Sequence, residues 1–230
     1  MSITFSVVIP AHNEENYIGK VLHSLKQQTY QNFETIVVTN GCNDKTSEIV
    51  SKRVNDRLKH LDLPVANVSR ARNFGAGKAS GEVLVFLDAD CTLENDALAK
   101  IKEKFNENHV VASTKTMPDD LSARFKFIST FKNVYLQTGL YKGSSGALIC
   151  RRKDFDSVDG YDSNITVREH RKLILKLLSN GKYTCVNTPV TTSMRRMKGW
   201  GIGKVTGYWV KQWFADKFGD LKKSEYEKIR

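Results

Sequence analysis

The apolar run Val83–Leu87 ends in two acids, Asp88 and Asp90, and this feature constrains the fold of the chain most strongly. A short apolar run that follows a glycine, here Gly81, is typical of a central strand buried in an α/β sheet. Such sheets bind ligands just beyond the carboxyl ends of their strands. Hard cations such as Mg²⁺ prefer carboxylate oxygens and are often completed by substrate phosphates, so the two acids predict a metal site against a diphosphate. An ordinary capped loop is the alternative that the pattern leaves open.

The chain ahead of this run alternates between expected strands and helices. Residues 6–10 form an apolar strand that ends at Pro10, and apolar residues then recur at helical spacing from Tyr17 to Leu25. A second strand over residues 33–38 leads into a helix from about Ser47. Strands that alternate with helices predict the α/β class, with a parallel, doubly wound sheet and right-handed connections.

An ordered set of short motifs gives the chain a resemblance to a known family. The motifs are Val7–Glu14, Asn40–Thr46, Ala71–Gly75, Ala79–Gly81 and Phe86–Asp90, and the likeness continues through Gly146, Arg151–Arg152 and Val158–Asp162. Over about residues 5–185 the chain resembles the family 2 glycosyltransferases, which have the Rossmann-like, mostly parallel GT-A fold. The resemblance implies that a sugar moves, with inversion, from a nucleotide-diphosphate sugar to an acceptor in glycan, polysaccharide or glycolipid synthesis. It also implies Mg²⁺ or Mn²⁺ as a cofactor, and it favours UDP-linked over GDP-linked sugars.

We therefore expect a glycosyltransferase domain over residues 1–190, made of a nucleotide-binding half (1–115) and an acceptor half (116–190). By the resemblance, the loops after the first two strands take the base and ribose, Arg72 lies near the diphosphate, and Asp90 binds the metal. Turn or helix-start roles for Glu14 and Asp44, and a surface ion pair for Arg72, remain open. The expected substrate-binding residues are Pro10, His12, Glu14, Asn40, Asp44, Arg72, Asp88, Gly143, Ser144 and Trp200; the metal ligands are Asp90 and Asp88, and Arg195 and Arg196 assist departure of the diphosphate.

The chain departs from the family pattern at two places. Relatives often carry two acids where this chain has Thr39–Asn40, so an amide replaces one expected contact to the base. Relatives also often have a catalytic Asp where this chain has His170. Because inverting transfer to an alcohol requires a base, His170 and the adjacent Glu169 are the two candidates, both at an expected helix start. A partly buried, structural His170 is the alternative.

Positive charge is concentrated near the carboxyl end. The chain carries a formal charge of +11, and residues 191–230 contain aromatic residues from Trp200 to Phe218, largely at steps of three and four, among several lysines. A basic helix with an aromatic face predicts attachment to an anionic membrane surface and favours a lipid-linked acceptor. Packing on the domain or on a partner subunit is the alternative. The stretch Arg124–Tyr135 shows a weaker form of the same pattern.

Other features exclude several classes of protein. The loop after the first strand is not glycine-rich, which disfavours a dinucleotide-binding dehydrogenase, and Gly75–Ala79 lacks the spacing of a P-loop. No recognised nucleic-acid motif accompanies the positive charge.

The four dispersed cysteines are expected to be free thiols. With neither a signal peptide nor an apolar span expected, we predict a cytoplasmic protein, peripheral to the membrane. A catalytically silent relative that binds sugar nucleotides or a partner protein, and a sugar nucleotidyltransferase, remain open.

Overall fold

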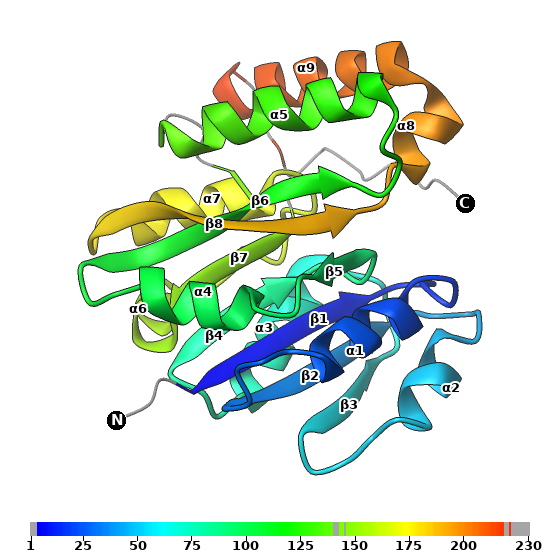
Figure 1. Cartoon of the computed structure of the whole chain (residues 1–230), viewed down its shortest axis with the longest axis vertical. Helices are drawn as coiled ribbons and strands as arrows, with labels where there is room; N and C mark the ends of the chain where they lie inside the picture. Colours follow the sequence, from blue (N-terminus) through cyan, green and yellow to red (C-terminus); the bar gives the residue numbers. More distant parts are fainter. Residues whose placement is uncertain (1–3, 140–142, 145, 219–220, 222–230) are drawn as a thin grey trace.

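The computed structural model describes residues 4–139, 143–144, 146–218 and 221 of the chain. In these ranges, one eight-stranded sheet of order β3-β2-β1-β4-β7-β6-β8-β5 lies between helices (Figure 1). The strands are β1 Phe5–Ala11, β2 Phe33–Asn40, β3 Leu58–Leu63, β4 Val83–Leu87, β5 Cys91–Leu93, β6 His109–Pro118, β7 Ala147–Arg151 and β8 Lys182–Thr192. The helices are α1 Ile18–Lys26, α2 Thr46–Ser51, α3 Val68–Lys78, α4 Ala97–Lys104, α5 Ala123–Gln137, α6 Arg152–Ser157, α7 Glu169–Leu177, α8 Arg195–Trp200 and α9 Ile202–Phe218.

The amino-terminal half has the predicted parallel arrangement. β1 pairs in parallel with both β2 and β4, and β2 pairs in parallel with β3. The carboxyl ends of these strands therefore meet at one edge of the sheet, where the loops that follow β1, β2 and β4 open together. This edge is the position at which open α/β sheets bind ligands.

The second half adds the antiparallel pairings. β7 runs antiparallel to β4 and β6, and β5 runs antiparallel to β8, whereas β6 and β8 are parallel. The sheet thus stays mostly parallel, as the resemblance implies. An apolar run marks a strand but not its direction, because side chains alternate between the two faces in either orientation.

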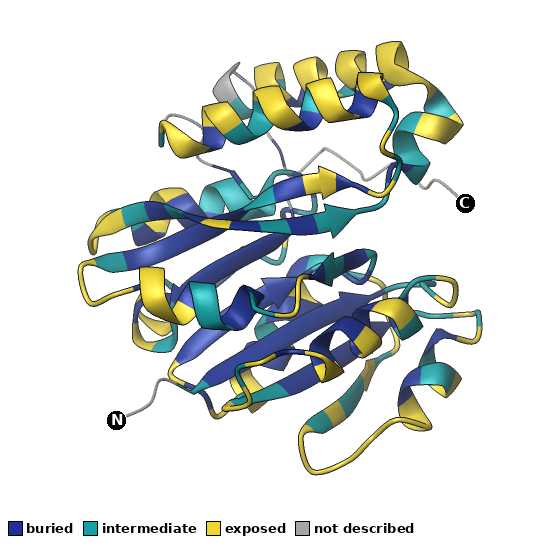
Figure 2. Cartoon of the chain, in the orientation of Figure 1, coloured by how far each residue is buried: buried dark blue, intermediate teal, exposed yellow. Residues whose placement is uncertain are grey.

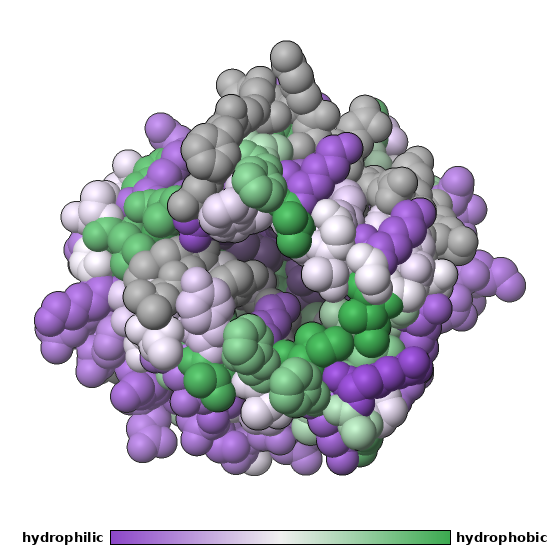
Figure 3. All heavy atoms as spheres, turned by 90° about the horizontal axis from the view of Figure 1, so that it is seen from above, coloured by the Kyte–Doolittle hydropathy of each residue, from purple (hydrophilic) through white to green (hydrophobic). Residues whose placement is uncertain are grey.

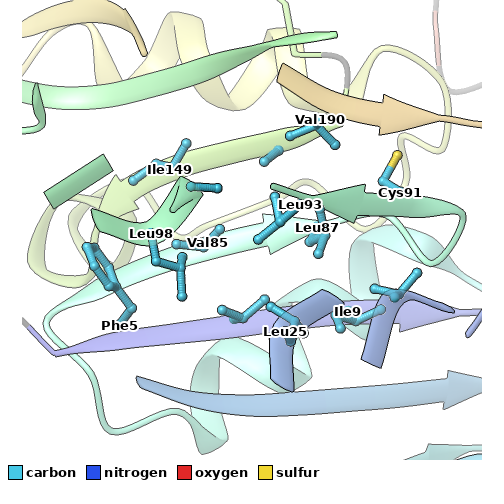
Figure 4. Packing of buried hydrophobic residues seen from close by; sticks show 14 of the residues in the cluster. Phe5, Ile9, Leu25, Val85, Leu87, Cys91, Leu93, Leu98, Ile149 and Val190 are labelled. Atoms are coloured by element: carbon cyan, nitrogen blue, oxygen red, sulfur yellow. The ribbon is translucent and has the colours of Figure 1, made fainter. Parts of the chain in front are cut away.

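The continuous apolar run of β4 is explained by burial on both faces of the sheet. Val85 and Leu87 pack in a cluster with Leu25 of α1 and Leu98 of α4 (Figure 4). Phe86 belongs to the cluster on the opposite face, to which α3, α6 and α7 contribute. Both faces of β4 are therefore packed, which fixes the strand and the start of the turn that follows it.

Close packing of α3 on β1 depends on a glycine. A Cβ atom added to Gly75 would lie 2.5 Å from Cγ1 of Val8, so a larger residue there would push the helix away from the strand. Glycine permits this close helix–strand contact. The contact fixes the helix that carries Arg72.

The carboxyl-terminal segment contains two helices in place of one continuous helix. Gly201, with φ 79°, separates α8 from α9, so Trp200 belongs to α8. Val205 and Gln212 of α9 are buried, whereas Trp209 and Val210 are exposed. Much of the described part of α9 is exposed (Figure 2). None of the helices in the described ranges is both long and apolar enough to cross a membrane. Residues 219–220 and 222–230 of the predicted segment lie outside the described residues.

Candidate functional site

Asp88 and Asp90 lie in the turn that follows β4. The backbone N–H of Asp88 donates to the carbonyl of Gly146, and the N–H of Cys91 donates to the carbonyl of Asp88, at 3.3 and 3.0 Å. Ala89 between them is buried, while the side chains of Asp88 and Asp90 are 37% and 21% exposed. The alternation therefore points the small apolar residue inward and leaves both carboxylates open to a ligand.

Arg72 connects three parts of the site. Its guanidinium donates to Asp88 at 2.8 Å and to Glu169 at 2.7 Å, and the side chain is only 3% exposed. Its pKa is raised, because the pull of Glu169 and Asp88 outweighs the effect of burial. Arg72 is thus a permanent cation at the start of the Asp88–Asp90 turn and not a surface residue.

Hydrogen bonds hold α3 against the segment that precedes α7. The Asn73 amide donates to the carbonyl of Tyr161 and accepts from its N–H, at 2.8 and 2.9 Å. Ser69 Oγ donates to the carbonyl of Ile165 at 2.6 Å. These contacts bring Glu169, at the start of α7, within reach of the Arg72 guanidinium.

Replacing Arg72 is expected to cost stability as well as binding. Arg72→Met leaves the carboxylate of Glu169, which is 12% exposed, without its cation. Loss of one partner from a buried ion pair costs about 3 kcal/mol or more. Chemical denaturation would measure this loss. Arg70→Met, an exposed neighbour on the same helix, is the matched control and should unfold at the wild-type denaturant concentration. Equal stability of both variants would contradict a structural role for the ion pairs that Arg72 makes with Asp88 and Glu169.

Arg195 of α8 closes the site from the carboxyl-terminal side. Its two terminal nitrogens donate to Glu14 at 2.7 and 2.5 Å, and Nη2 lies 3.3 Å from Oδ2 of Asp90. Its guanidinium also lies 4.7 Å from the ring centroid of Tyr17. Burial raises the pKa of Asp90 to about 6, although Arg195 acts to lower it. Asp90 thus already faces a cation, which is the environment that a metal would provide.

His170 lies one residue beyond Glu169 in the first turn of α7. Its Nδ1 is 2.9 Å from the hydroxyl of Tyr161, and the two rings pack edge to face. The side chain is partly buried, and no hydrogen bond of the described residues involves its Nε2 atom. Burial holds the pKa of His170 well below its usual value, and nearby Arg72 adds to the effect. The imidazole is therefore neutral near pH 7 and can accept a proton.

The first loop is fixed to the loop after β2. His12 Nδ1 lies 2.7 Å from the carbonyl of Asn40. Asn40 is buried, and its amide donates to the carbonyl of Ala11 and accepts from the N–H of Asn67. Both ends of the Asn40 amide are thus bonded to the backbone, which gives this residue a structural part in holding the loops.

Asp44 and the remaining predicted residues have local partners. Asp44 accepts from the N–H groups of Glu15 and Thr46, which makes it a turn residue that also joins two loops. Ser144 Oγ donates to the carbonyl of Ala147 at 2.7 Å, and Gly143 beside it is buried. Pro10 is buried near the end of β1. Arg196 and Lys204 lie 5.8 and 4.7 Å from the centroid of the Trp200 ring.

One residue of the site was not predicted from the sequence. Lys132 lies on α5, one turn from buried Ser129 and Leu136, and so on the inner face of the helix. Burial lowers the pKa of its amine, while the charge of Asp88 acts in the opposite direction. In the sequence, Lys132 cannot be distinguished from Arg124 and Lys126, which are basic residues of the same helix. It differs from them in lying on the inner face of the helix, whereas they are exposed.

The two carboxylates fit a divalent cation whose coordination a diphosphate completes. No group of three or more His, Cys, Asp or Glu side chains that could hold a metal occurs among the described residues. Asp88 and Asp90 supply hard oxygen ligands, and Mg²⁺ or Mn²⁺ is commonly held by one or two carboxylates together with substrate phosphates. The donor set therefore suits a metal that arrives with a nucleotide.

The chain is similar in sequence to several known proteins. The family model described as glycosyl transferase family 2 matches residues 6–158. Glycosyltransferase GlyA of Streptococcus pneumoniae serotype 4 is 35% identical over 104 residues, which are 44% of this chain and 15% of GlyA. The matched region spans less than half the length of the curated relatives.

Two solved structures share the fold. TarS 1–349 of Staphylococcus aureus in complex with UDP has a TM-score of 0.69 at 23% identity, covering 84% of this chain and 61% of that one. The mannosyltransferase PcManGT from Pyrobaculum calidifontis, in complex with GDP-Man and Mn²⁺, has a TM-score of 0.69 at 19% identity, covering 92% and 65%. At these identities the likeness shows the shared architecture.

Proposed function

Because the chain belongs to glycosyl transferase family 2, we propose that it transfers a sugar from a nucleoside-diphosphate sugar to an acceptor, with inversion at the anomeric carbon. The observation that carries the proposal is the meeting of Asp88 and Asp90 with Arg72 and Arg195 at the carboxyl edge of the sheet. Paired carboxylates beside two arginines suit a metal-bound diphosphate, whose charge needs both a cation and N–H donors.

Each residue then has a task in the reaction. Asp90 and Asp88 would hold Mg²⁺ or Mn²⁺, which neutralises the diphosphate as the glycosyl bond breaks. Arg72 orients Asp88, Arg195 would donate to the diphosphate beside Asp90, and Arg196 of the same helix would add positive charge. Lys132 adds a further positive charge from the acceptor side. UDP is the favoured nucleotide, supported by the UDP complex of TarS, and GDP the second choice, supported by the GDP-Man complex of PcManGT.

His170 is the favoured base for a hydroxyl acceptor. Glu169 is bonded to Arg72, whereas Nε2 of His170 takes part in no hydrogen bond of the described residues. The contact between Nδ1 and Tyr161 fixes the ring, and a base held by a third group is typical of proton transfer sites. Glu169 then serves to orient Arg72.

We also propose a lipid-linked acceptor and action at the cytoplasmic face of a membrane. The support is the +11 charge of the chain and its concentration, with aromatic residues, in the carboxyl-terminal segment. If the acceptor oxygen belonged to a lipid phosphate, it would already be ionised, and the replacement of an acid by His170 would be tolerated.

A donor panel tests the proposed function. The protein is incubated with UDP-GlcNAc or GDP-Man and Mn²⁺, with membrane lipid extracts as acceptors, and the released nucleoside diphosphate is measured. Release from one donor, dependent on lipid and lost in EDTA, is the expected result. Consumption of a nucleoside triphosphate with a sugar phosphate would instead indicate a nucleotidyltransferase. Binding of the donor without release under any condition would indicate a silent relative.

Arg195→Ala is expected to change metal and nucleotide binding in opposite directions. Arg195 lies 3.3 Å from Asp90, so its removal frees that carboxylate and should tighten binding of Mn²⁺ alone. The same change removes a donor for the diphosphate and should weaken binding of UDP or GDP by about tenfold or more, since a charge-assisted hydrogen bond contributes roughly 1.5–3 kcal/mol. Isothermal titration measures both. Lys198→Ala, whose partner is Asp120, is the control and should alter neither. Weaker binding of Mn²⁺ alone by Arg195→Ala would contradict the idea that Arg195 and the metal compete for the Asp90 carboxylate.

A further inference from the structure

Exposed apolar side chains gather on two helices. Of the 15 large hydrophobic residues that are exposed in the described ranges, nine belong to α5 and α9. Phe127 and Phe131 are 75% and 70% exposed, and Trp209 and Val210 are 39% and 49% exposed. The full set is Phe127, Phe131, Val134 and Tyr135 on α5, and Ile202, Trp209, Val210, Trp213 and Phe214 on α9. We call these nine residues the aromatic face.

Both helices lie at the same end of the molecule, above β6 and β8 (Figure 1). Seen from that side, apolar residues lie beside a hollow in the surface, interspersed with hydrophilic ones (Figure 3). Exposed apolar clusters of this kind mark sites of interaction, because scattered single residues are the rule on soluble surfaces.

Separate residues already anchor the two helices to the domain. α5 is held by buried Phe125 and Leu136, and by Asn133, whose amide donates to the carbonyl of Thr116 and accepts from its N–H, both at 2.8 Å. α9 is held by buried Val205 and by its one acid, Asp216. These anchoring contacts are made by residues other than Phe127, Phe131 and Val210, which are exposed.

The charges on α5 and α9 indicate what kind of partner the aromatic face binds. α5 contains three Lys or Arg residues and no acid, and α9 contains three lysines and Asp216. Asp216 is 5% exposed and is neutralised by Arg168, Arg171 and Lys172 at 3.2, 2.9 and 2.7 Å. The surface of both helices thus presents cations and apolar groups without an exposed acid. Anionic lipid headgroups above an acyl boundary complement this combination.

We propose that the aromatic face of α5 and α9 together is the surface on which the chain binds an anionic membrane. Both helices lie flat in the headgroup region, with Phe127, Phe131 and Trp209 in the acyl boundary and the lysines at the phosphates. The inference rests on the proposed function only for the lipid-linked acceptor, which would reach the site beside α5.

Co-sedimentation with vesicles tests the proposal. The wild-type chain is mixed with phosphatidylserine-containing or pure phosphatidylcholine vesicles at low and high salt. Phe127→Ser with Phe131→Ser removes the apolar groups of α5, and Trp209→Ser with Val210→Ser removes those of α9. Val54→Ser with Val65→Ser is the matched control, since these residues are 52% and 64% exposed next to β3, at the opposite end of the molecule. Thermal shift with UDP or GDP and Mn²⁺ checks the nucleotide site in every variant.

Wild type and control are expected to bind anionic vesicles at low salt and to release at high salt, and both helix variants should lose about tenfold or more in partitioning. All four proteins should keep the same nucleotide response, so a failure of vesicle binding is distinct from a failure of the proposed function. Three results would overturn the proposal: wild type that stays in solution at low salt, binding that the α5 pair does not weaken, or a self-associated chain that the same substitutions convert to monomers without any vesicle binding. The last result would assign the aromatic face to a second copy of the chain.

Discussion

Asp90→Asn is expected to reduce sugar transfer by more than about 100-fold without loss of the fold. Replacing residues that only support a metal ligand already costs about 10–100-fold, and Asp90 is the ligand itself in the proposed site. In the turn after β4, the carboxylate is partly buried and lies 3.3 Å from Nη2 of Arg195. Initial rates of nucleoside diphosphate release at saturating Mn²⁺ would measure the loss.

The stability of Asp90→Asn shows whether its loss of activity comes from the missing carboxylate or from a misfolded protein. Burial raises the pKa of Asp90 from 3.8 to about 6, so the folded protein holds its proton more tightly than the unfolded chain does. This group therefore makes the wild type less stable as pH rises from about 4 to about 6. Asp90→Asn should melt at the wild-type temperature or above it at pH 7, and the gain should vanish below about pH 4. Asp96→Asn, an exposed acid paired with Lys100, is the control and should retain full transfer. Wild-type turnover by Asp90→Asn would contradict the metal role.

His170→Ala is expected to lower kcat by about 10²–10⁴ when the acceptor is a hydroxyl, the usual contribution of a general base. His170→Asp restores the acid of the related enzymes and should recover much of the rate. Because burial holds the pKa of His170 well below 6.5, the imidazole stays neutral, and kcat should not fall between pH 8 and pH 6.5. Single-turnover rates across this pH range measure both effects.

Glu169→Gln distinguishes the two candidates for the base. Its carboxylate is bonded to Arg72, so its loss should weaken nucleotide binding and stability through Arg72 and leave the pH profile unchanged. A larger fall in kcat for Glu169→Gln than for His170→Ala would assign the base to Glu169. Full activity in both variants would show that neither residue is the base, as expected for an acceptor such as a lipid phosphate whose oxygen is already ionised.

The elements closest to Asp88 were predictable because their signals are local. The apolar run of β4 and the carboxylates after it lie within ten residues, and the spacing of apolar residues in α1 follows from burial of one face of that helix. Glu169 and His170 lie at the start of α7, as the apolar spacing after them indicated. Local pattern was sufficient wherever neighbours in sequence are also neighbours in space.

The contacts that turn these residues into one site were not predictable. Arg72 and Glu169 are 97 residues apart in sequence, and Arg195 and Glu14 are 181 apart. Sequence alone allowed Arg72 to be a surface residue, because its burial depends on the tight packing of α3 against β1. Asn40 looked like a base contact, yet both ends of its amide hold backbone groups.

Thermal unfolding with nucleotides is the most direct test of the central claim that Asp88 and Asp90 bind a nucleoside diphosphate through a metal. Wild type and Asp90→Asn are heated with UDP or GDP at millimolar concentration, with Mn²⁺ or with EDTA. A ligand at 100 times its Kd stabilises the folded state by about 2.7 kcal/mol, which raises Tm by roughly 5 °C or more for a chain of this size. We expect this rise for wild type with one nucleotide and Mn²⁺, and its loss in EDTA and in Asp90→Asn. The absence of any rise with either nucleotide in Mn²⁺, or an equal rise in Asp90→Asn, would contradict the claim.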